Sequence, residues 1–394
     1  MKKAGIITAT RAEYGLLSPV IRELRRFEND AFQAQLIVTG THLSRGYGYT
    51  VNEIREDQLR IDHEIPVSVS SETVADISAN QADMLVKMTA LFAGEGYDAV
   101  VILGDRYEML AAAMAAVNTQ TPVFHICGGD ISEGAIDDCI RHCITKMSYL
   151  HFPTNEESRR RVIQLGEQPD RVFNFGSPGM DNVIEAADMS REEALGAIGL
   201  GACRYALCTY HPVTLGKNGV EPALSELMEA MRAFPEIEFI VTKSNADQGG
   251  ARINAILERE EKTMPNLHVY ASLGVRRYLS LMRYACFVLG NSSSGLMEAP
   301  AFHIPTVNIG DRQKGRLRTE GVIDCGEDAP SIIQAVRLAL SDAFREKCGK
   351  AENPYGDGHA GERIAGKIYE AIHMDIDLKK PFYDMYDKQG STVK

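Results

Sequence analysis

The sequence predicts an α/β protein with two doubly wound, Rossmann-like domains that face a cleft. Short apolar runs alternate along the chain with longer segments in which apolar residues recur at helical spacing. The runs are continuously apolar, which is typical of parallel strands buried on both faces of a sheet. The alternation starts again near residue 205 of a 394-residue chain, so two consecutive sheets fit the length better than one sheet.

The first half of the chain predicts strands that each lead into a helix or a polar turn. The first strand is followed by a helix with apolar residues at helical spacing, and the second strand ends at a glycine. Strands are expected at residues 4–8, 34–39, 61–69, 99–103, 121–126, 149–153 and 171–175. Helices are expected at residues 14–27, 73–93, 109–117 and 134–147.

The second half repeats the pattern and ends in a separate helix. Strands are expected at residues 205–209, 239–242, 267–270, 286–289 and 306–309, with helices at 222–232, 251–260, 274–284 and 295–301. The boundary is placed near residues 177–187, after a glycine. The predicted domains are residues 1–180, 181–365 and a C-terminal helix and tail, 366–394, that packs back toward the N-terminal domain.

Composition narrows the class of partner. The formal net charge of −12 argues against a nucleic acid held by bulk charge. No apolar run approaches the roughly 18–20 residues of a membrane span. Arg11 and Glu13 interrupt the first apolar stretch, so no signal peptide is expected. The eight cysteines form no CxxC pair, which predicts reduced thiols, a cytoplasmic protein and no zinc site.

A serine-rich turn at residues 290–295 is the feature around which the second half is organised. An apolar run ends at Gly290, and the expected helix begins at Gly295. Unpaired N–H groups at a helix N-terminus, with hydroxyls from Ser292, Ser293 and Ser294, would bind a phosphate or diphosphate. The alternative is that these serines are ordinary N-caps.

Polar clusters follow most of the predicted strands. They lie at residues 8–14, 40–42, 104–106, 125–130, 136–142, 210–214, 244–247, 290–298 and 310–316. Ligands of doubly wound sheets bind at the carboxyl ends of the strands. A polar turn after a strand is expected in any case, but nearly all of these clusters mix carboxylate, histidine and arginine, which favours a functional site over solvated loops.

The two halves supply different groups. In the second half Ser292, Ser293 and Arg312 suit a diphosphate, and Glu298 could accept both hydroxyls of a ribose or simply interact with the helix dipole. The first half has four acids facing four cationic or titratable groups: Asp105, Asp130, Asp137 and Asp138 with Arg11, Arg106, Arg141 and His142. Such a set can separate the pKa values of an acid and a base, and the alternative is a structural ion network.

These motifs, in this order, resemble those of the hydrolysing UDP-N-acetylglucosamine 2-epimerases of bacterial sialic-acid and related nonulosonic-acid pathways. The resemblance covers residues 3–380. It rests on Arg11-Ala-Glu-Tyr-Gly, Gly104-Asp-Arg, Gly128-Gly-Asp with the stretch 136–146, His211-Pro-Val-Thr, Gly290-Asn-Ser-Ser-Ser-Gly and Gly310-Asp-Arg-Gln-Lys-Gly-Arg316. It implies the GT-B architecture, which also serves many other sugar-nucleotide enzymes.

The resemblance also implies roles for individual residues. Positions matching those that hold the substrate and its nucleotide are Arg11, Arg106, Asn245, Ser292, Ser293, Glu298 and Arg312, and Arg141 joins this set. Positions matching those assigned to chemistry are Asp105, Asp137, Asp138 and His211. Several relatives have a glutamate where this chain has Cys127, so Asp130 or Asp105 would take its role. Some relatives also have a serine where this chain has Gly15.

The resemblance implies hydrolysis of UDP-N-acetylglucosamine to N-acetylmannosamine and UDP. It implies a nucleotide-sugar substrate, no cofactor or metal, and a homo-oligomer, either a dimer or a tetramer. Three alternatives stay open: the same reaction on a GDP-linked diacetylbacillosamine in legionaminic-acid biosynthesis, a glycosyltransferase on the same architecture, and a non-catalytic sugar-nucleotide sensor.

Overall fold

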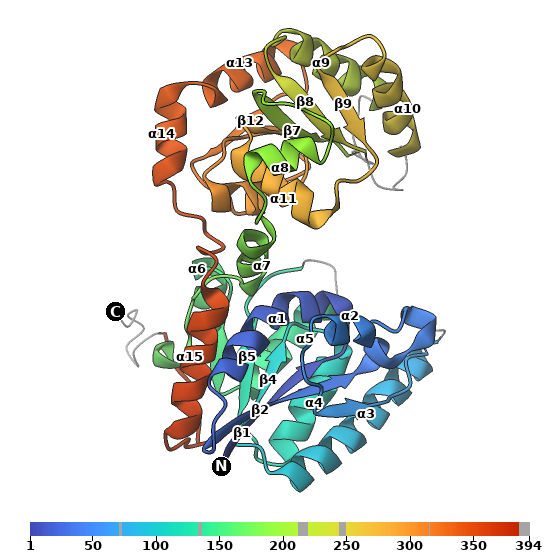
Figure 1. Cartoon of the computed structure of the whole chain (residues 1–394). Coiled ribbons are helices and arrows are strands. Elements are labelled where there is room, and N and C mark those ends of the chain that lie inside the picture. Colours follow the sequence, from blue (N-terminus) through green and yellow to red (C-terminus); the bar gives the residue numbers. More distant parts are fainter. Residues whose placement is uncertain (71–72, 133–135, 212–219, 244–249, 315, 386–394) are drawn as a thin grey trace. The chain divides into compact units, whose positions relative to one another are not determined.

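The computed structural model describes residues 1–70, 73–132, 136–211, 220–243, 250–314 and 316–385 (Figure 1). The chain divides into two compact units. The first unit is Met1–Asn182 with Gly358–Lys394, and the second is Val183–Asp357. The predicted limit at residue 365 would cut helix α15 (Ala360–His373), which belongs entirely to the first unit. None of the described helices is both long enough and apolar enough to cross a membrane.

The first unit is built on a six-stranded parallel sheet. Its strands are β1 (Lys2–Thr8), β2 (Phe32–Thr39), β3 (His63–Ile65), β4 (Ala99–Leu103), β5 (Val123–Ile126) and β6 (Leu150–Phe152). They lie in the order β3-β2-β1-β4-β5-β6. The strand order reverses between β1 and β4, and the crevice at such a switch point is where doubly wound sheets bind ligands.

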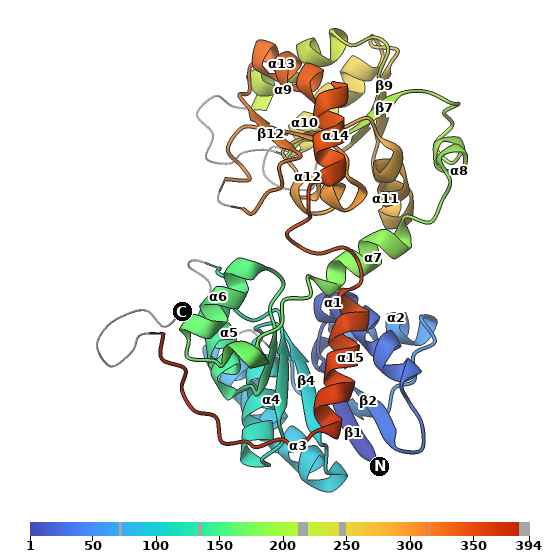
Figure 2. The same cartoon turned by 90° about the vertical axis from the view of Figure 1, so that its left-hand side faces the viewer.

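Helices cover both faces of this sheet (Figures 1 and 2). They are α1 (Arg11–Arg26), α2 (Val51–Glu56), α3 (Val74–Glu95), α4 (Tyr107–Asn118), α5 (Ile136–Met147), α6 (Glu156–Gln164) and α15. One core cluster joins α1, α2 and α15 to one face, and another joins α3, α4 and α5 to the other. Within β1, Ile6 belongs to the first cluster and Ile7 to the second, because successive side chains point to opposite faces.

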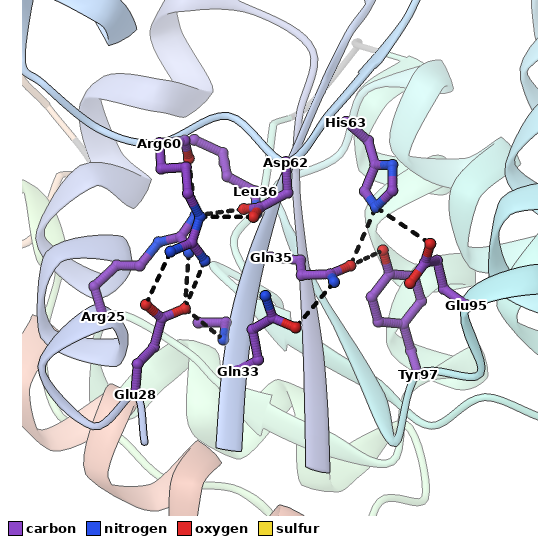
Figure 3. Close-up of polar contacts among 11 residues, drawn as sticks. Arg25, Glu28, Gln33, Gln35, Leu36, Arg60, Asp62, His63, Glu95 and Tyr97 are labelled. Carbon is purple, nitrogen blue, oxygen red and sulfur yellow. Dashed lines mark hydrogen bonds and ion pairs between the residues drawn. The ribbon is translucent and has the colours of Figure 1, made fainter. Parts of the chain in front are cut away.

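A polar network secures β3 at the edge of the sheet (Figure 3). Asp62, just before β3, accepts hydrogen bonds from Arg25 at 2.5 Å, from Arg60 at 2.8 Å and from the Leu36 backbone of β2 at 2.7 Å. The strand was predicted over residues 61–69 but has only three residues. Pro66 follows it directly, and a proline has no N–H to donate to the ladder.

The second unit repeats the same topology with a second parallel sheet. Its strands are β7 (Tyr205–Thr209), β8 (Glu238–Thr242), β9 (Leu267–Tyr270), β10 (Val288–Gly290), β11 (Thr306–Ile309) and β12 (Val322–Cys325). The order is β12-β11-β10-β7-β8-β9, so the switch point lies between β7 and β10. Helices α9 (Val220–Arg232), α10 (Gly250–Glu261) and α13 (Ala329–Ala339) share one core cluster, and α8 (Arg191–Gly196) and α11 (Gly274–Tyr284) share the other.

The predicted fold class is confirmed, but several elements differ from the prediction. The strand expected at residues 171–175 is wrong: only Val172 pairs with the sheet, through a single bridge to His151, while the rings of Phe173 and Phe175 stack on each other. The prediction missed β12 and the helices α2, α6, α7 (Pro178–Ala186), α8, α13 and α14 (Asp342–Lys350).

Candidate active site

The first unit carries a carboxylate–arginine cluster after β4 and β5. Asp105 is the second residue after β4, and Arg141 lies on α5, which follows β5. Arg141 is only 4% exposed. Its Nε donates to Oδ2 of Asp105 at 2.8 Å, and its Nη2 contacts the same oxygen. Asp105 is one of the predicted acids and Arg141 one of the predicted cations that face them, and the structure joins these two in an ion pair.

Arg141 also holds Asp138, one helical turn earlier on α5. Its Nη1 donates to Oδ1 of Asp138 at 3.2 Å and to the backbone oxygen of Asp130 at 2.6 Å. The backbone N–H of Ser132 donates to Asp138 at 2.8 Å. That hydrogen bond lowers the pKa of Asp138 below its ordinary value, and His142 and Arg141 add to the effect. Asp138 is therefore a carboxylate at neutral pH.

The other two predicted acids lie differently. The side chain of Asp130 accepts a hydrogen bond from Ser158 at 2.5 Å, so Asp130 joins the cluster through its backbone rather than its carboxylate. Asp137 is exposed on α5 and has no polar partner among the described residues. The structure does not bring Asp137 into the Arg141 cluster.

Arg11 and Arg106 lie at the switch point of the first unit, at the start of α1 and just before α4. Arg11 is largely exposed, with its Nε 3.6 Å from Glu53. Arg106 donates to both carboxylate oxygens of buried Glu108, at 3.2 and 3.3 Å. Neither arginine forms a hydrogen bond or ion pair with Asp105 in the described part of the chain.

Glu13 is a buried acid at the same switch point that the sequence analysis did not select. Its Oε2 accepts the backbone N–H groups of Ala9 and Thr10 at 2.9 and 3.1 Å, completing a capping box for α1. Its Oε1 is buried without a hydrogen-bond partner among the described residues. Burial and, to a smaller extent, the charge of Glu108 raise the pKa of Glu13 to about 7.

The second unit contains a pocket of about 450 Å³ around its own switch point. Gly290 ends β10 there with a φ of +130°, and a Cβ at this position would lie 2.1 Å from the carbonyl oxygen of Thr209 on β7. Only glycine allows this close approach of the two strand ends. Polar residues that line the pocket include Thr209, His211, Thr242, Lys243, Ser272, Tyr278, Ser292, Ser293, Ser294 and Glu298.

Glu298 lines this pocket beside Ser294. The hydroxyl of Ser294 donates to Glu298 at 2.5 Å and lies 3.0 Å from the hydroxyl of Tyr278. Burial raises the pKa of Glu298 above its ordinary value, although the Ser294 hydrogen bond opposes the effect. The pocket thus holds a sheltered carboxylate beside three serine hydroxyls.

The helix predicted at residues 295–301 is much shorter in the structure. Helix α12 is a single turn, Ser294–Met297, followed by a 3₁₀ turn over Ala299–Phe302. Pro300 has no N–H to bond the carbonyl of Leu296, so an α-helix cannot continue through it. The expected anion site at the N-terminus of a full helix is therefore corrected to a turn that presents serine hydroxyls to the pocket.

Asn291 joins the serine turn to His211 and Arg312. Its side chain accepts the backbone N–H of His211 at 2.7 Å and donates to the His211 carbonyl at 2.8 Å. The backbone oxygen of Asn291 accepts hydrogen bonds from Arg312 at 2.9 Å and from buried Gln313 at 2.8 Å. The structure thus brings together three predicted regions through an asparagine that was not selected from the sequence.

Asn245 lies outside the described residues. Lys243, directly after β8, lines the pocket although the sequence analysis selected only the residues that follow it. Among the described residues, no group of three or more His, Cys, Asp or Glu is placed to hold a metal ion.

The sequence model of the family described as UDP-N-acetylglucosamine 2-epimerase matches residues 24–369. The chain therefore belongs to the UDP-N-acetylglucosamine 2-epimerase family. A GDP/UDP-N,N'-diacetylbacillosamine 2-epimerase (hydrolyzing) from Campylobacter jejuni is 36% identical over 98% of this chain and 99% of its own. The polysialic acid biosynthesis protein P7 of Escherichia coli is 35% identical over 98% of both chains.

Solved structures of this epimerase family have the same fold. A UDP-GlcNAc 2-epimerase from Neisseria meningitidis, bound to UDP-GlcNAc, superposes with a TM-score of 0.77 at 19% identity, covering 94% of this chain and 100% of that one. A lipopolysaccharide outer core galactosyltransferase superposes with a TM-score of 0.53 at 11% identity, covering 94% and 100%. The fold is GT-B-like, as the resemblance implied.

Cys127, where several epimerases of this family were expected to have a glutamate, lies beside the Asp105 cluster. Burial raises the pKa of its thiol, and the charges of Asp130 and Asp105 raise it further. The thiol is therefore protonated at neutral pH and cannot serve as a general base. Its backbone has a φ of +65°, a left-handed conformation that is uncommon outside glycine.

Proposed function

We propose that this epimerase-family protein hydrolyses UDP-N-acetylglucosamine with inversion at C2, releasing N-acetylmannosamine and UDP. The observation that carries the proposal is the buried guanidinium of Arg141, which holds the carboxylates of Asp105 and Asp138 in one cluster. The pocket of the second unit, with its serine hydroxyls and sheltered Glu298, supports binding of the nucleotide.

The reaction requires an elimination followed by an addition. The C2 proton has no carbonyl beside it, so a base removes it while the bond from C1 to the diphosphate oxygen breaks. UDP leaves and a C1–C2 double bond forms. Water then adds across this bond. An acid delivers a proton to C2 on the opposite face, and a base takes a proton from the water molecule whose oxygen bonds to C1.

Residue roles follow from the charges in the two units. Asp138 is ionised at neutral pH, so in this proposal it accepts a proton or orients water and does not deliver the C2 proton. Asp105 shares Arg141 with it and is the second group assigned to proton transfer. Negative charge that develops on the departing diphosphate would be stabilised by Arg312, the serine turn and His211.

A second donor class has direct support from the relatives. Hydrolyzing epimerases of N,N'-diacetylbacillosamine linked to UDP or GDP are 36% and 34% identical to this chain. A UDP-N-acetylglucosamine 2-epimerase from Neisseria meningitidis is 28% identical over 98% of this chain and the whole of its own. The alternative proposal is therefore the same chemistry on a diacetylbacillosamine donor, in legionaminic-acid rather than sialic-acid biosynthesis.

One experiment separates these proposals. The protein is incubated in deuterated water with each donor in turn, and the products are followed by proton NMR. We expect a free sugar, inverted and deuterated at C2, from UDP-N-acetylglucosamine at a much higher kcat/KM than from the diacetylbacillosamine donor, and the reverse order would favour the alternative. Free sugar without deuterium at C2 would exclude the elimination mechanism for either donor, and an epimer still linked to the nucleotide would exclude the hydrolytic step.

The same assay tests the remaining alternatives. Transfer of the sugar to an added acceptor would favour a glycosyltransferase, and binding of donor without turnover would favour a sensor. The proposed chemistry needs no metal, so full turnover is expected in the presence of EDTA. We also propose that the protein is a homo-oligomer, which light scattering during size-exclusion chromatography tests directly.

A further inference from the structure

The chain that follows α15 returns along the first unit to the side that carries α5 and α6 (Figure 2). Residues 380–383, here called the C-terminal strap, make its main contacts. The ring of Phe382 packs on Gly166, where a Cβ would lie 2.3 Å from the ring. The backbone N–H of Tyr383 donates to the Gly166 oxygen at 2.9 Å, and Gln168 donates to the oxygen of Pro381 at 3.3 Å.

Lys380 is the polar centre of this strap. Its ammonium group donates to the backbone oxygens of Lys146 and Ser148 at 2.8 and 2.7 Å, and it lies 2.7 Å from Oε2 of Glu167. An ammonium group has three donors, so all three find an acceptor. Two of these acceptors are carbonyls at the C-terminal end of α5, which the helix itself cannot satisfy and where its dipole favours a cation.

Glu167 links the strap to α5 and β6 from a fully buried position. It also accepts a hydrogen bond from Lys146 of α5 at 2.5 Å and one from His151 of β6 at 3.0 Å. Burial alone would raise the pKa of Glu167, but the hydrogen bonds from His151, Lys146 and Lys380 outweigh it and lower the pKa to about 2. Removal of Lys380 therefore leaves a buried carboxylate with one cation fewer.

The helix that receives these contacts carries Asp138 and Arg141. Its buried residues Ile140 and Ile144 pack against the sheet side of the unit, and this apolar packing is not directional. The hydrogen bonds of Lys380 to the end of α5 are directional and oppose a slide of the helix along its axis. A shift of the helix would displace Arg141 from Asp105.

We propose that Lys380 is a positioning residue, which sets the axial position of α5 and thereby the contact between Arg141 and Asp105. The inference rests on the proposed function, because it concerns the residues to which that function assigns proton transfer. Lys380 itself touches no residue of the Asp105 cluster, so its effect would pass entirely through α5.

The test compares Lys380→Met with Lys379→Met in the full chain. Both changes remove one ammonium and keep the apolar stem, but the exposed ammonium of Lys379 has no partner among the described residues. For Lys380→Met we expect kcat to fall between about tenfold and a hundredfold, as for a small misplacement of catalytic groups, while KM stays within about twofold. Lys379→Met should match the unchanged protein.

Hydrogen exchange provides a readout that does not depend on the reaction. Amides at the end of α5, residues 144–148, should exchange faster in Lys380→Met while those of α1 remain as protected as before. Unchanged exchange in α5 would overturn the anchoring, and faster exchange with an unchanged kcat would overturn the positioning role. If the unchanged protein turns over neither donor, the proposed function fails, and the exchange result alone then decides whether Lys380 anchors α5.

Discussion

The side-chain amide of Asn291 bonds to both backbone groups of His211, accepting from its N–H and donating to its carbonyl. Both residues are buried, and 80 positions separate them in the chain. This pair holds the chain just after β7 against the serine turn that follows β10. Since His211 lines the pocket, Asn291 is the residue that holds the predicted leaving-group site in shape.

Replacing Asn291 by alanine should therefore lower both stability and activity. Two hydrogen bonds to buried backbone groups are lost, which should reduce the free energy of unfolding by about 1–3 kcal/mol. Urea unfolding measures the loss, and kcat/KM should fall together with it. The same substitution at exposed Asn118 serves as the control and should leave both quantities unchanged.

Arg141→Lys should separate charge from geometry in the Asp105 cluster. The guanidinium meets four acceptors on Asp105, Asp130, Asp138 and Ser132, which a compact ammonium cannot reach at once. We expect kcat to fall by about a hundredfold or more, because both carboxylates lose their orientation. Steady-state kinetics measures this fall.

The control for that change is Arg160→Lys, since Arg160 is 76% exposed and lies on the neighbouring helix α6. Circular dichroism should give the same spectrum for both variants and the unchanged protein. Full activity of Arg141→Lys would mean that the cluster needs only a positive charge, and the proposed proton-transfer pair would lose its structural basis.

Much of this arrangement could be predicted from strand ends alone. Asp105 lies just after β4, and Arg141 lies on α5, the helix that follows β5. These two strands are neighbours in a parallel sheet, so their carboxyl ends meet at one edge. The alternation of buried strands and amphipathic helices is likewise a local property of the sequence. Four strands were predicted residue for residue: β4, β7, β9 and β11.

The rest depends on tertiary contacts that leave no local pattern. Nothing in the sequence near Asn291 indicates that its amide would face His211. The buried position of Glu13 likewise depends on the residues that surround the start of α1 in the folded protein. Helix α12 is shorter than predicted because an α-helix cannot continue through Pro300, which the predicted range of residues 295–301 included. Asp137 and Asp138 are adjacent acids, and only the rotation of α5 decides that Asp138 faces Arg141.

Cys127→Ala should retain activity within about threefold, because a protonated thiol supplies neither a base nor a charge at neutral pH. Alanine is smaller than cysteine, so this substitution introduces no clash with the neighbouring Asp105 and Asp130. Turnover of the preferred donor measures the outcome. Asp105→Asn, made alongside it, should abolish turnover while the protein stays folded, and loss of activity in Cys127→Ala instead would return the cysteine to the mechanism.

Glu298→Gln should weaken binding of the nucleoside diphosphate by about tenfold to a hundredfold. The proposed contact is from ribose hydroxyls to a carboxylate, and hydrogen bonds to charged groups contribute about 1.5–3 kcal/mol. Titration calorimetry with UDP measures it without any reaction. Glu320→Gln, at a carboxylate that is 73% exposed in the same unit, should bind UDP normally.

Glu13 predicts a pH dependence of stability whose sign follows from its burial. Its pKa rises from an ordinary 4.5 to about 7 in the folded protein. Between pH 4.5 and pH 7 the unfolded chain has Glu13 ionised, whereas the folded protein keeps it protonated. The stability that Glu13 contributes is therefore fully present below pH 4.5 and is lost as the pH rises through about 7. The total loss should be roughly 3 kcal/mol, from about 1.4 kcal/mol for each pH unit.

Comparison with Glu13→Gln isolates this effect, because glutamine does not ionise and its amide oxygen can still accept the N–H groups of Ala9 and Thr10. Urea unfolding of both proteins at pH 5 and pH 8 gives the difference in free energy at each pH. The unchanged protein should lose stability relative to Glu13→Gln between the two conditions, because ionised Glu13 has a buried Oε1 without a partner among the described residues. A difference that stays constant with pH would mean that Glu13 is already ionised at pH 5 in the folded protein.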